Sequence, residues 1–412
     1  MSRSSQTLSS CLSGAFILAA ALAVAGGLGG AQPEALLPGV EPDKWARDFA
    51  AEHALTDPLL LPGFRYLGNP TCNGGDCHSA EKATEQSGQM IGDESNIWAE
   101  NDPHRNAFNT LFNADSKAIA AKMSISDAYA SQRCITCHAT NVPEAARAAE
   151  FSLSANAVGC EVCHGPSGGS LTDEAKKGYK DPHAEAGWTI KERTRLGAAG
   201  LRTEYGLIDT TDLAVRASTC VSCHLQIDKD LLDAGHPPLQ FEMYAYNYYA
   251  YDPTSAYATH WDDGKVEWIN AKLWAIGQAA SWEASKKQVE AWKGKSWDTA
   301  TADALVSMYG GGATIAKKHF GADTPEGLLK GAYSADACKA AAKDLAALAP
   351  GATGPVARKN IAFGVTALCQ AWFTASGASE PDAFWDAWEV AAAGGEGDAW
   401  TNAIEAMIKT IQ

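Results

Sequence analysis

The chain has 412 residues, and its 49 acidic against 33 basic side chains give a formal net charge of −16 at pH 7 and a sequence pI of about 5.0. This acidity argues against binding to nucleic acid or anionic lipid, because both carry charge of the same sign. It favours transient partners with a basic docking patch, whose encounter the opposite charges accelerate. An acidic surface that serves only solubility is the alternative, and it needs no partner.

Residues 1–31 resemble a secretory signal sequence. Arg3 stands in a polar start, an apolar run follows from residue 15 to residue 28, and small residues close the segment. The run is shorter than the roughly 20 residues that span a bilayer. We therefore expect cleavage near residue 32, export to the periplasm as a soluble protein, and no integral membrane span after signal removal. An uncleaved anchor is the alternative.

Four cysteine pairs between residues 72 and 224 each end in an immediately following histidine. Two such thiols can form thioethers with one haem while the next imidazole ligates its iron, so the pattern predicts four covalently attached haem c groups. Zinc sites share the CxxC spacing, but zinc does not require a histidine after every second cysteine. The first spacer has four residues instead of two, and its Gly74-Gly75 can loop out. The predicted attachment cysteines are Cys72, Cys77, Cys134, Cys137, Cys160, Cys163, Cys220 and Cys223, and the predicted proximal iron ligands are His78, His138, His164 and His224.

The sequence Asp-Pro-His occurs twice, ending at His104 and at His183. Asp before Pro is typical of a helix N-cap followed by the first helical position. This start would place each histidine in a first turn, on a face that can lie over a porphyrin. We therefore predict that both histidines are distal iron ligands.

His236 lies between a glycine and two prolines, in a fixed loop whose backbone can approach a flat ring closely. It is predicted to be a third distal ligand. Further candidates are His53, on the aromatic face of an N-terminal helix, and His260, which precedes a tryptophan. His319 is expected at a surface or at the end of a helix. Methionine is the competing ligand type, and the methionines in or beside the motif region are Met90, Met123 and Met243.

The composition of the chain changes near residue 250. The motif region is rich in Gly, Pro, Asn and Asp, and haem groups would supply much of its buried surface. From residue 266 onward, apolar residues recur at intervals of three and four, which is the helical period. We expect a mainly α fold: an N-terminal segment (32–68), an irregular, haem-packed tetrahaem domain (69–245), and an α-helical bundle domain (246–412) interrupted at Gly310–Gly312, at Pro350-Gly351 and at Gly394-Gly395.

Cys338 and Cys369 are the two cysteines that remain after haem attachment and signal removal. Both lie in segments with helical periodicity, and paired thiols usually close in an oxidising compartment. The sequence therefore predicts a disulfide between two helices of the bundle. Two separately buried free thiols are the alternative.

Several of these motifs occur in an order that resembles the tetrahaem cytochromes of the cytochrome c-554 type, which are periplasmic electron carriers. The first motif is followed by Trp98 and His104, the third reads Val-Gly-Cys-Glu-Val-Cys-His-Gly-Pro over 158–166, and the fourth is followed by Gly-His-Pro over 235–237. The resemblance covers roughly residues 68–242.

The resemblance implies haem groups in close, partly stacked pairs, with one five-coordinate iron in the type member. It also implies that His104 ligates the iron bound by His164. Three features depart from the family pattern: the longer first spacer, the displacement of a histidine to His183, and the appended helical domain.

These observations favour a carrier that passes single electrons between redox protein partners, and we assign no catalytic residue. Histidine on both sides of the iron lowers the reduction potential relative to His/Met ligation. The alternative function is a multihaem oxidoreductase acting on nitrogen or sulfur oxo-compounds, which requires an open iron position lined by donors. A third reading is a haem filament that shares ligands between subunits. The carrier is favoured for two reasons. All four predicted proximal ligands are histidines, and the chain holds enough further histidines to supply distal ligands without a second subunit.

Overall fold

The computed structural model describes residues 61–411, except 62, 74–77, 80–91, 93, 184, 186, 226, 228, 249–260, 262, 264–265 and 294–298. The predicted signal, Cys77, His53, His260 and Met90 lie outside the described residues. Within them the regular structure is helical, and the β pairing consists of two isolated bridges, Phe64 with Ser170 and Tyr66 with Arg147. The prediction of a mainly α fold is confirmed. No helix in the described part of the chain is long and apolar enough to cross a membrane.

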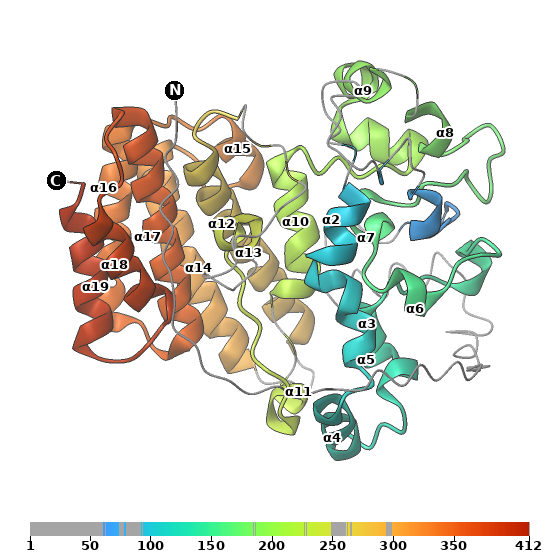
Figure 1. Ribbon diagram of the computed structural model, residues 1–412, viewed down its shortest axis with the longest axis horizontal. Helices are drawn as coiled ribbons and strands as arrows, with labels where there is room; N and C mark the ends of the chain where they lie inside the picture. Colours follow the sequence, from blue (N-terminus) through green and yellow to red (C-terminus); the bar gives the residue numbers. More distant parts are fainter. Residues whose placement is uncertain are drawn as a thin grey trace, which may run out of the picture. The chain divides into compact units, whose positions relative to one another are not determined.

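Short helices joined by loops make up the motif region, as its composition predicted (Figure 1). Three of the four motifs end a helix, so that the histidine occupies the last helical position. The α-helices here are α2 (Glu94–Glu100), α3 (Ala107–Thr110), α4 (Ala114–Lys122), α5 (Gln132–His138), α6 (Leu153–Asn156), α7 (Cys160–His164), α8 (Lys180–His183), α9 (Trp188–Tyr205), α10 (Leu213–His224), α11 (Lys229–Ala234) and α12 (Met243–Tyr248), and the 3₁₀-helices are η1 (Asn69–Thr71), η2 (Pro103–Asn106), η3 (Ala128–Ala130) and η4 (Glu144–Ala146).

The remainder of the chain forms longer, packed helices. Helix α13 contacts α14 and α17, α16 contacts α17, and α18 contacts α19 (Figure 1). Helix α17 is buried over most of its length between Arg358 and Phe373. The helices are α13 (Ile269–Trp292), α14 (Thr299–Phe320), α15 (Pro325–Leu329), α16 (Ala335–Ala346), α17 (Gly354–Ser376), α18 (Asp382–Ala392) and α19 (Asp398–Lys409), with the 3₁₀-helix η5 at Ala349–Gly351.

The three consecutive glycines do not end a helix, contrary to the prediction from sequence; they lie inside α14. A Cβ at Gly310 would lie 2.9 Å from Nε1 of Trp282, and one at Gly312 would collide with the side-chain amide of Gln278. Both contacts come from α13. The glycines therefore permit close packing of two helices, which offsets their poor helix propensity.

Helix α10, which carries the fourth motif, contributes to the same apolar core as the C-terminal helices. Its Leu213, Ala217 and Val221 belong to one buried cluster with residues of α13, α16, α17, α18 and α19. A second cluster, around Tyr66, Phe108 and neighbouring residues, lies in the motif region. The division of the chain at residue 245 stays a prediction.

The predicted disulfide is wrong for this structure. Cys338 of α16 and Cys369 of α17 are fully buried free thiols. Burial raises the pKa of both thiols, that of Cys338 to about 12. In this alanine-rich helix contact each sulfur fills space as a small apolar side chain does.

A buried ion pair joins α10 to the chain that follows α12. Both Nη atoms of Arg216 donate to the carboxylate of Asp263, at 2.7 and 2.9 Å, and Nη1 also donates to the side chain of Asn247. The guanidinium lies 4.1 Å from the ring centre of Trp261. Because its charge is paired and hydrogen-bonded, Arg216 can remain buried at 4% exposure.

Candidate metal centres

The predicted attachment cysteines of the second, third and fourth motifs lie three residues apart on helices. Cys134 and Cys137 lie on α5, so their side chains are on one helix face about one turn apart. The same spacing applies on α7 and α10. Each helix thus presents two thiols and a following imidazole to one region of space. Of the first motif, Cys72 and His78 are described.

The structure brings six of the predicted ligands together as three pairs, each pairing a proximal with a distal candidate. The ring centres of His78 and His183 are 5.9 Å apart, with the rings inclined by 9°. Those of His104 and His224 are 5.8 Å apart at 75°, and their Nε2 atoms are separated by 3.5 Å. Those of His138 and His236 are 6.3 Å apart at 77°.

These separations match two imidazoles that ligate one metal ion from opposite sides. Metal–imidazole bonds are about 2.0–2.1 Å long, so such ligands hold their nitrogens about 4 Å apart and their ring centres about 6 Å apart. The 3.5 Å between the Nε2 atoms of His104 and His224 is close to that value. The paired histidines and the adjacent cysteines therefore fit haem c.

The Nδ1 atoms of four paired histidines lie near neutral oxygen atoms. Those of His138, His236 and His183 lie 2.9, 2.8 and 2.5 Å from the backbone carbonyls of Ala107, Pro237 and Lys180. That of His224 lies 3.2 Å from the hydroxyl of Tyr246.

That hydroxyl itself donates to the backbone carbonyl of Gln240, so it accepts the proton of His224 Nδ1. A proton held at Nδ1 leaves Nε2 with a lone pair for a metal. The hydrogen bonds therefore select the tautomer that iron ligation requires.

Two paired histidines contact carboxylates instead. His78 Nδ1 lies 3.0 Å from Glu94 Oε2, and His104 Nδ1 lies 2.9 Å from Asp102 Oδ1. The hydrogen bond to Glu94 raises the pKa of His78. At His104, burial would lower the pKa, but the contact with Asp102 outweighs it and the pKa is raised.

Three of the histidines with neutral partners show a pKa shift in the opposite direction. Burial lowers the pKa of His138 and of His183, and it lowers that of His224 to about 3, with a further contribution from the nearby His104. The protein therefore stabilises a positive charge at His78 and His104 and disfavours it at the other three.

Cysteines of different motifs also meet. Cys72 of the first motif is hydrogen-bonded to Cys160 of the third, and Cys137 of the second is hydrogen-bonded to Cys223 of the fourth. Cys163 of the third motif interacts electrostatically with Cys220 of the fourth. These interactions, and the contacts between α7 and α10, show that thiols of different motifs lie near one another.

The pairing of His104 differs from the one that the family resemblance implied. Its backbone carbonyl accepts a 3.4 Å hydrogen bond from the N–H of Val158, just before the third motif, but its imidazole faces His224 of the fourth. The backbone of η2 therefore lies against one motif while its side chain reaches another. His164, the fourth proximal candidate, has Nδ1 3.5 Å from the hydroxyl of Thr210.

The two Asp-Pro-His sequences are also used differently. Asp102 caps η2, because its side chain accepts a 2.9 Å hydrogen bond from the N–H of His104, as predicted. Asp181 is inside the first turn of α8, which begins one residue earlier at Lys180. Nevertheless, the structure places both histidines opposite a proximal candidate.

Other candidates lie away from these pairs. His319 is in the last turn of α14, where its Nε2 lies 2.6 Å from the carboxylate of Asp344. This agrees with the predicted helix-end position. Met243 is buried in the large apolar core and Met123 follows α4. The roles of Glu94 and Tyr246 were missed, since neither residue stands next in sequence to the histidine that it contacts.

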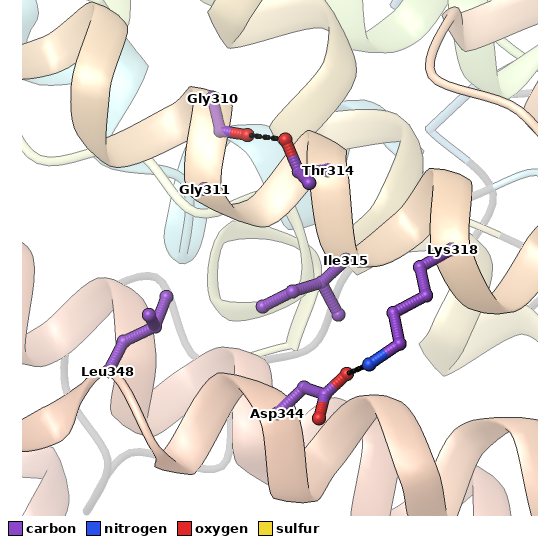
Figure 2. Close-up of a pocket in the computed structure, with 7 residues that line it drawn as sticks. All are labelled: Gly310, Gly311, Thr314, Ile315, Lys318, Asp344 and Leu348. Carbon is purple, nitrogen blue, oxygen red and sulfur yellow. Dashed lines mark hydrogen bonds and ion pairs between the residues drawn. The ribbon is translucent and has the colours of Figure 1, made fainter.

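A surface pocket of about 430 Å³ lies in the bundle between α14 and the end of α16 (Figure 2). At one end Lys318 and Asp344 form a 2.6 Å ion pair. None of the lining residues is a predicted ligand or attachment cysteine, so this pocket is separate from the histidine pairs. Its lining consists of Gly310, Gly311, Thr314, Ile315, Lys318, Asp344 and Leu348.

Comparison with known proteins agrees with the interpretation of the cysteine–histidine motifs as haem attachment sites. Residues 71–165 match the family model described as cytochrome c554 and c-prime. No curated protein and no solved structure matches the chain. The matched segment contains the first three motifs and His104, whereas the fourth motif and the Gly-His-Pro at 235–237, which also carried the resemblance, lie outside it. Residues 71–165 are therefore similar to cytochrome c554 and c-prime, a family whose members carry covalently bound haem c.

Proposed function

We propose that this protein is an exported tetrahaem cytochrome that carries single electrons between redox protein partners. The observation that carries the proposal is the set of three facing histidine pairs, with ring centres 5.8–6.3 Å apart. In our assignment the two histidines of each pair would hold one iron of a bound haem c.

Closed axial positions favour electron transfer over bond chemistry. A bound haem c supplies a reversible one-electron couple, whereas catalysis at its iron needs a vacant position lined by donors. The imidazoles of His183, His104 and His236 would occupy that position at three irons. Four attachment motifs and four proximal histidines support a count of four haem groups.

The contacts between cysteines support a continuous relay. Each attachment cysteine is bonded to the edge of its haem, so cysteines in contact bring two haem edges together. If all four motifs hold haem, these neighbouring thiols would support a path for the electron from the first motif through the third and fourth to the second. This arrangement agrees with the close pairs implied by the family.

Two properties of the whole chain support the partners and the location that we propose. The net charge of −16 suits docking to a basic patch on a redox protein and disfavours nucleic acid as a partner. The signal-like residues 1–31 and the attachment motifs both support export to the periplasm as a soluble protein.

A coulometric titration of the purified, haem-loaded protein tests this function. We expect four electrons per chain, taken up in reversible one-electron steps, and oxidation of the reduced protein by a small basic redox protein at a rate that falls with added salt. Hydroxylamine, nitrite and sulfite should not be turned over. Sustained turnover of any of them would favour the oxidoreductase instead.

A further inference from the structure

The histidine pairs differ in the charge of the group that contacts Nδ1. Glu94, in the first turn of α2, contacts His78, and Asp102, the N-cap of η2, contacts His104. Both histidines of the third pair, His138 and His236, contact neutral backbone carbonyls. Each of the three sites therefore has two histidines as candidate ligands, but the groups that contact the Nδ1 atoms of these histidines differ from site to site.

Both carboxylates are held firmly in place. Glu94 Oε2 also accepts a 3.0 Å hydrogen bond from the N–H of Gly92, and the N–H of Ser95 donates to the carbonyl of His78 at 2.8 Å. Asp102 Oδ1 also accepts from the N–H of His104. The side chains are 19% and 13% exposed, so solvent and salt screen their charges only partly.

A carboxylate that accepts the Nδ1 proton makes the imidazole a more basic ligand. A more basic ligand and a nearby negative charge both stabilise ferric iron relative to ferrous iron, because reduction by one electron removes one positive charge from the centre. Second-shell hydrogen bonding of this kind is one of the means by which a protein sets a haem potential.

We infer that Glu94 and Asp102 are tuning residues, which lower the reduction potentials of the irons held by the His78/His183 and His104/His224 pairs below that of the His138/His236 iron. This inference rests on the proposed function, because it takes each pair to hold one iron. Among the irons held by these three pairs, the one at His138/His236 would then be reduced first.

Replacement of each carboxylate by its amide isolates the charge. Glu94→Gln and Asp102→Asn keep a side-chain oxygen that can accept the same hydrogen bonds, and Asn is as good an N-cap as Asp. The matched controls are Glu100→Gln, on the exposed end of α2, and Asp115→Asn, on the exposed surface of α4. Each control removes one negative charge without a described contact to a ligand histidine.

The measurement is a potentiometric titration of the haem-loaded proteins followed by visible absorption and EPR. We expect Glu94→Gln and Asp102→Asn each to shift the midpoint of one haem to a more positive potential and to change the EPR g-values of that haem. The other haem groups and both controls should stay at wild-type values. Unchanged midpoints in amide variants that keep their low-spin spectra would overturn the inference.

The wild-type protein supplies a second test that does not depend on the variants folding. As the potential is lowered, the EPR signal of the His138/His236 iron should disappear before those of the two carboxylate-linked irons. The reverse order would overturn the inference while leaving the proposed function intact. A wild-type protein without low-spin haem at these pairs would instead contradict the proposed function itself.

Discussion

His104 and His224 face each other with their Nε2 atoms 3.5 Å apart, although 120 residues separate them in the chain. His224 ends α10, and His104 lies in the first turn of η2, where Asp102 holds its Nδ1. If the fourth motif holds a haem as proposed, this relationship would make His104 a ligand of its iron.

His104→Ala tests that assignment. Removing the distal imidazole should convert one low-spin haem to high spin, raise its potential, and open a site that binds carbon monoxide or nitric oxide. The affected haem should be the one attached at Cys220 and Cys223. EPR and visible spectra of the variant give the spin state of its haem groups. Peptide mapping after labelling of the open site identifies the attachment motif of the haem that has changed.

His319→Ala is the control for this substitution, because His319 contacts Asp344 in the bundle and faces no described ligand histidine. It should leave every haem spectrum unchanged. An unchanged low-spin count in His104→Ala would show that His104 is not an iron ligand. Conversion of the haem attached at Cys160 and Cys163 would restore the pairing that the family resemblance implied.

Mass spectrometry of the mature protein should find a polypeptide that begins near residue 32 and carries four haem masses. The first site is the critical one, because its spacer of four residues is longer than the usual two and Cys77 lies outside the described residues. Three haem masses, with Cys72 and Cys77 joined by a disulfide, would reject the fourth site.

Glu242 predicts a pH dependence of stability. It is buried at 4% exposure and accepts hydrogen bonds from the N–H groups of Tyr244 and Ala245. Burial raises its pKa from 4.5 to about 7. A carboxyl group whose pKa is raised by folding contributes its full stabilisation at a pH below its pKa in the unfolded chain. This contribution is lost as the pH rises through about 7.

The loss amounts to at most about 3 kcal/mol, from about 1.4 kcal/mol per pKa unit. Glu242→Gln cannot ionise and keeps an acceptor for the backbone N–H groups. Its melting temperature should exceed that of the wild type at pH 8, and the difference should shrink towards pH 4.5. Equal pH dependence of the two melting temperatures would show that Glu242 does not titrate in this range.

The Arg216–Asp263 pair should contribute strongly to stability. Asp263→Ala leaves the buried guanidinium without its carboxylate, and loss of one partner of a buried pair costs about 3–5 kcal/mol. Glu290→Ala breaks the exposed pair with Lys293, whose side chains are 70% and 73% exposed, and should cost less than about 1 kcal/mol. Chemical denaturation of the haem-loaded proteins measures both, and similar losses would contradict the role of burial.

The parts of this architecture that the sequence could predict are those governed by local rules. The attachment motifs, the N-cap at Asp102 and the helical period after residue 266 depend on residues close together in the chain. The candidate distal ligands His104, His183 and His236 could be selected by local rigidity. The histidines that they face could not be predicted, because that pairing depends on tertiary packing of η2, α8 and the loop after α11.

The errors in the prediction have the same origin. The glycines of α14 were expected to interrupt a helix, but packing against Trp282 and Gln278 outweighs their propensity. Cys338 and Cys369 were expected to be bridged, but the helix contact buries them as separate thiols. Glu94 is 16 residues from His78, so no local pattern connects them.

EPR of the fully oxidised, haem-loaded protein tests the central claim, that facing histidine pairs hold the irons, most directly. Nearly parallel imidazole planes split the iron d orbitals more than perpendicular planes do. The 9° angle at His78/His183 therefore predicts a rhombic low-spin signal, and the 75° and 77° angles at the other pairs predict two low-spin signals of large anisotropy. Fewer than three bis-histidine low-spin irons per chain would contradict the account.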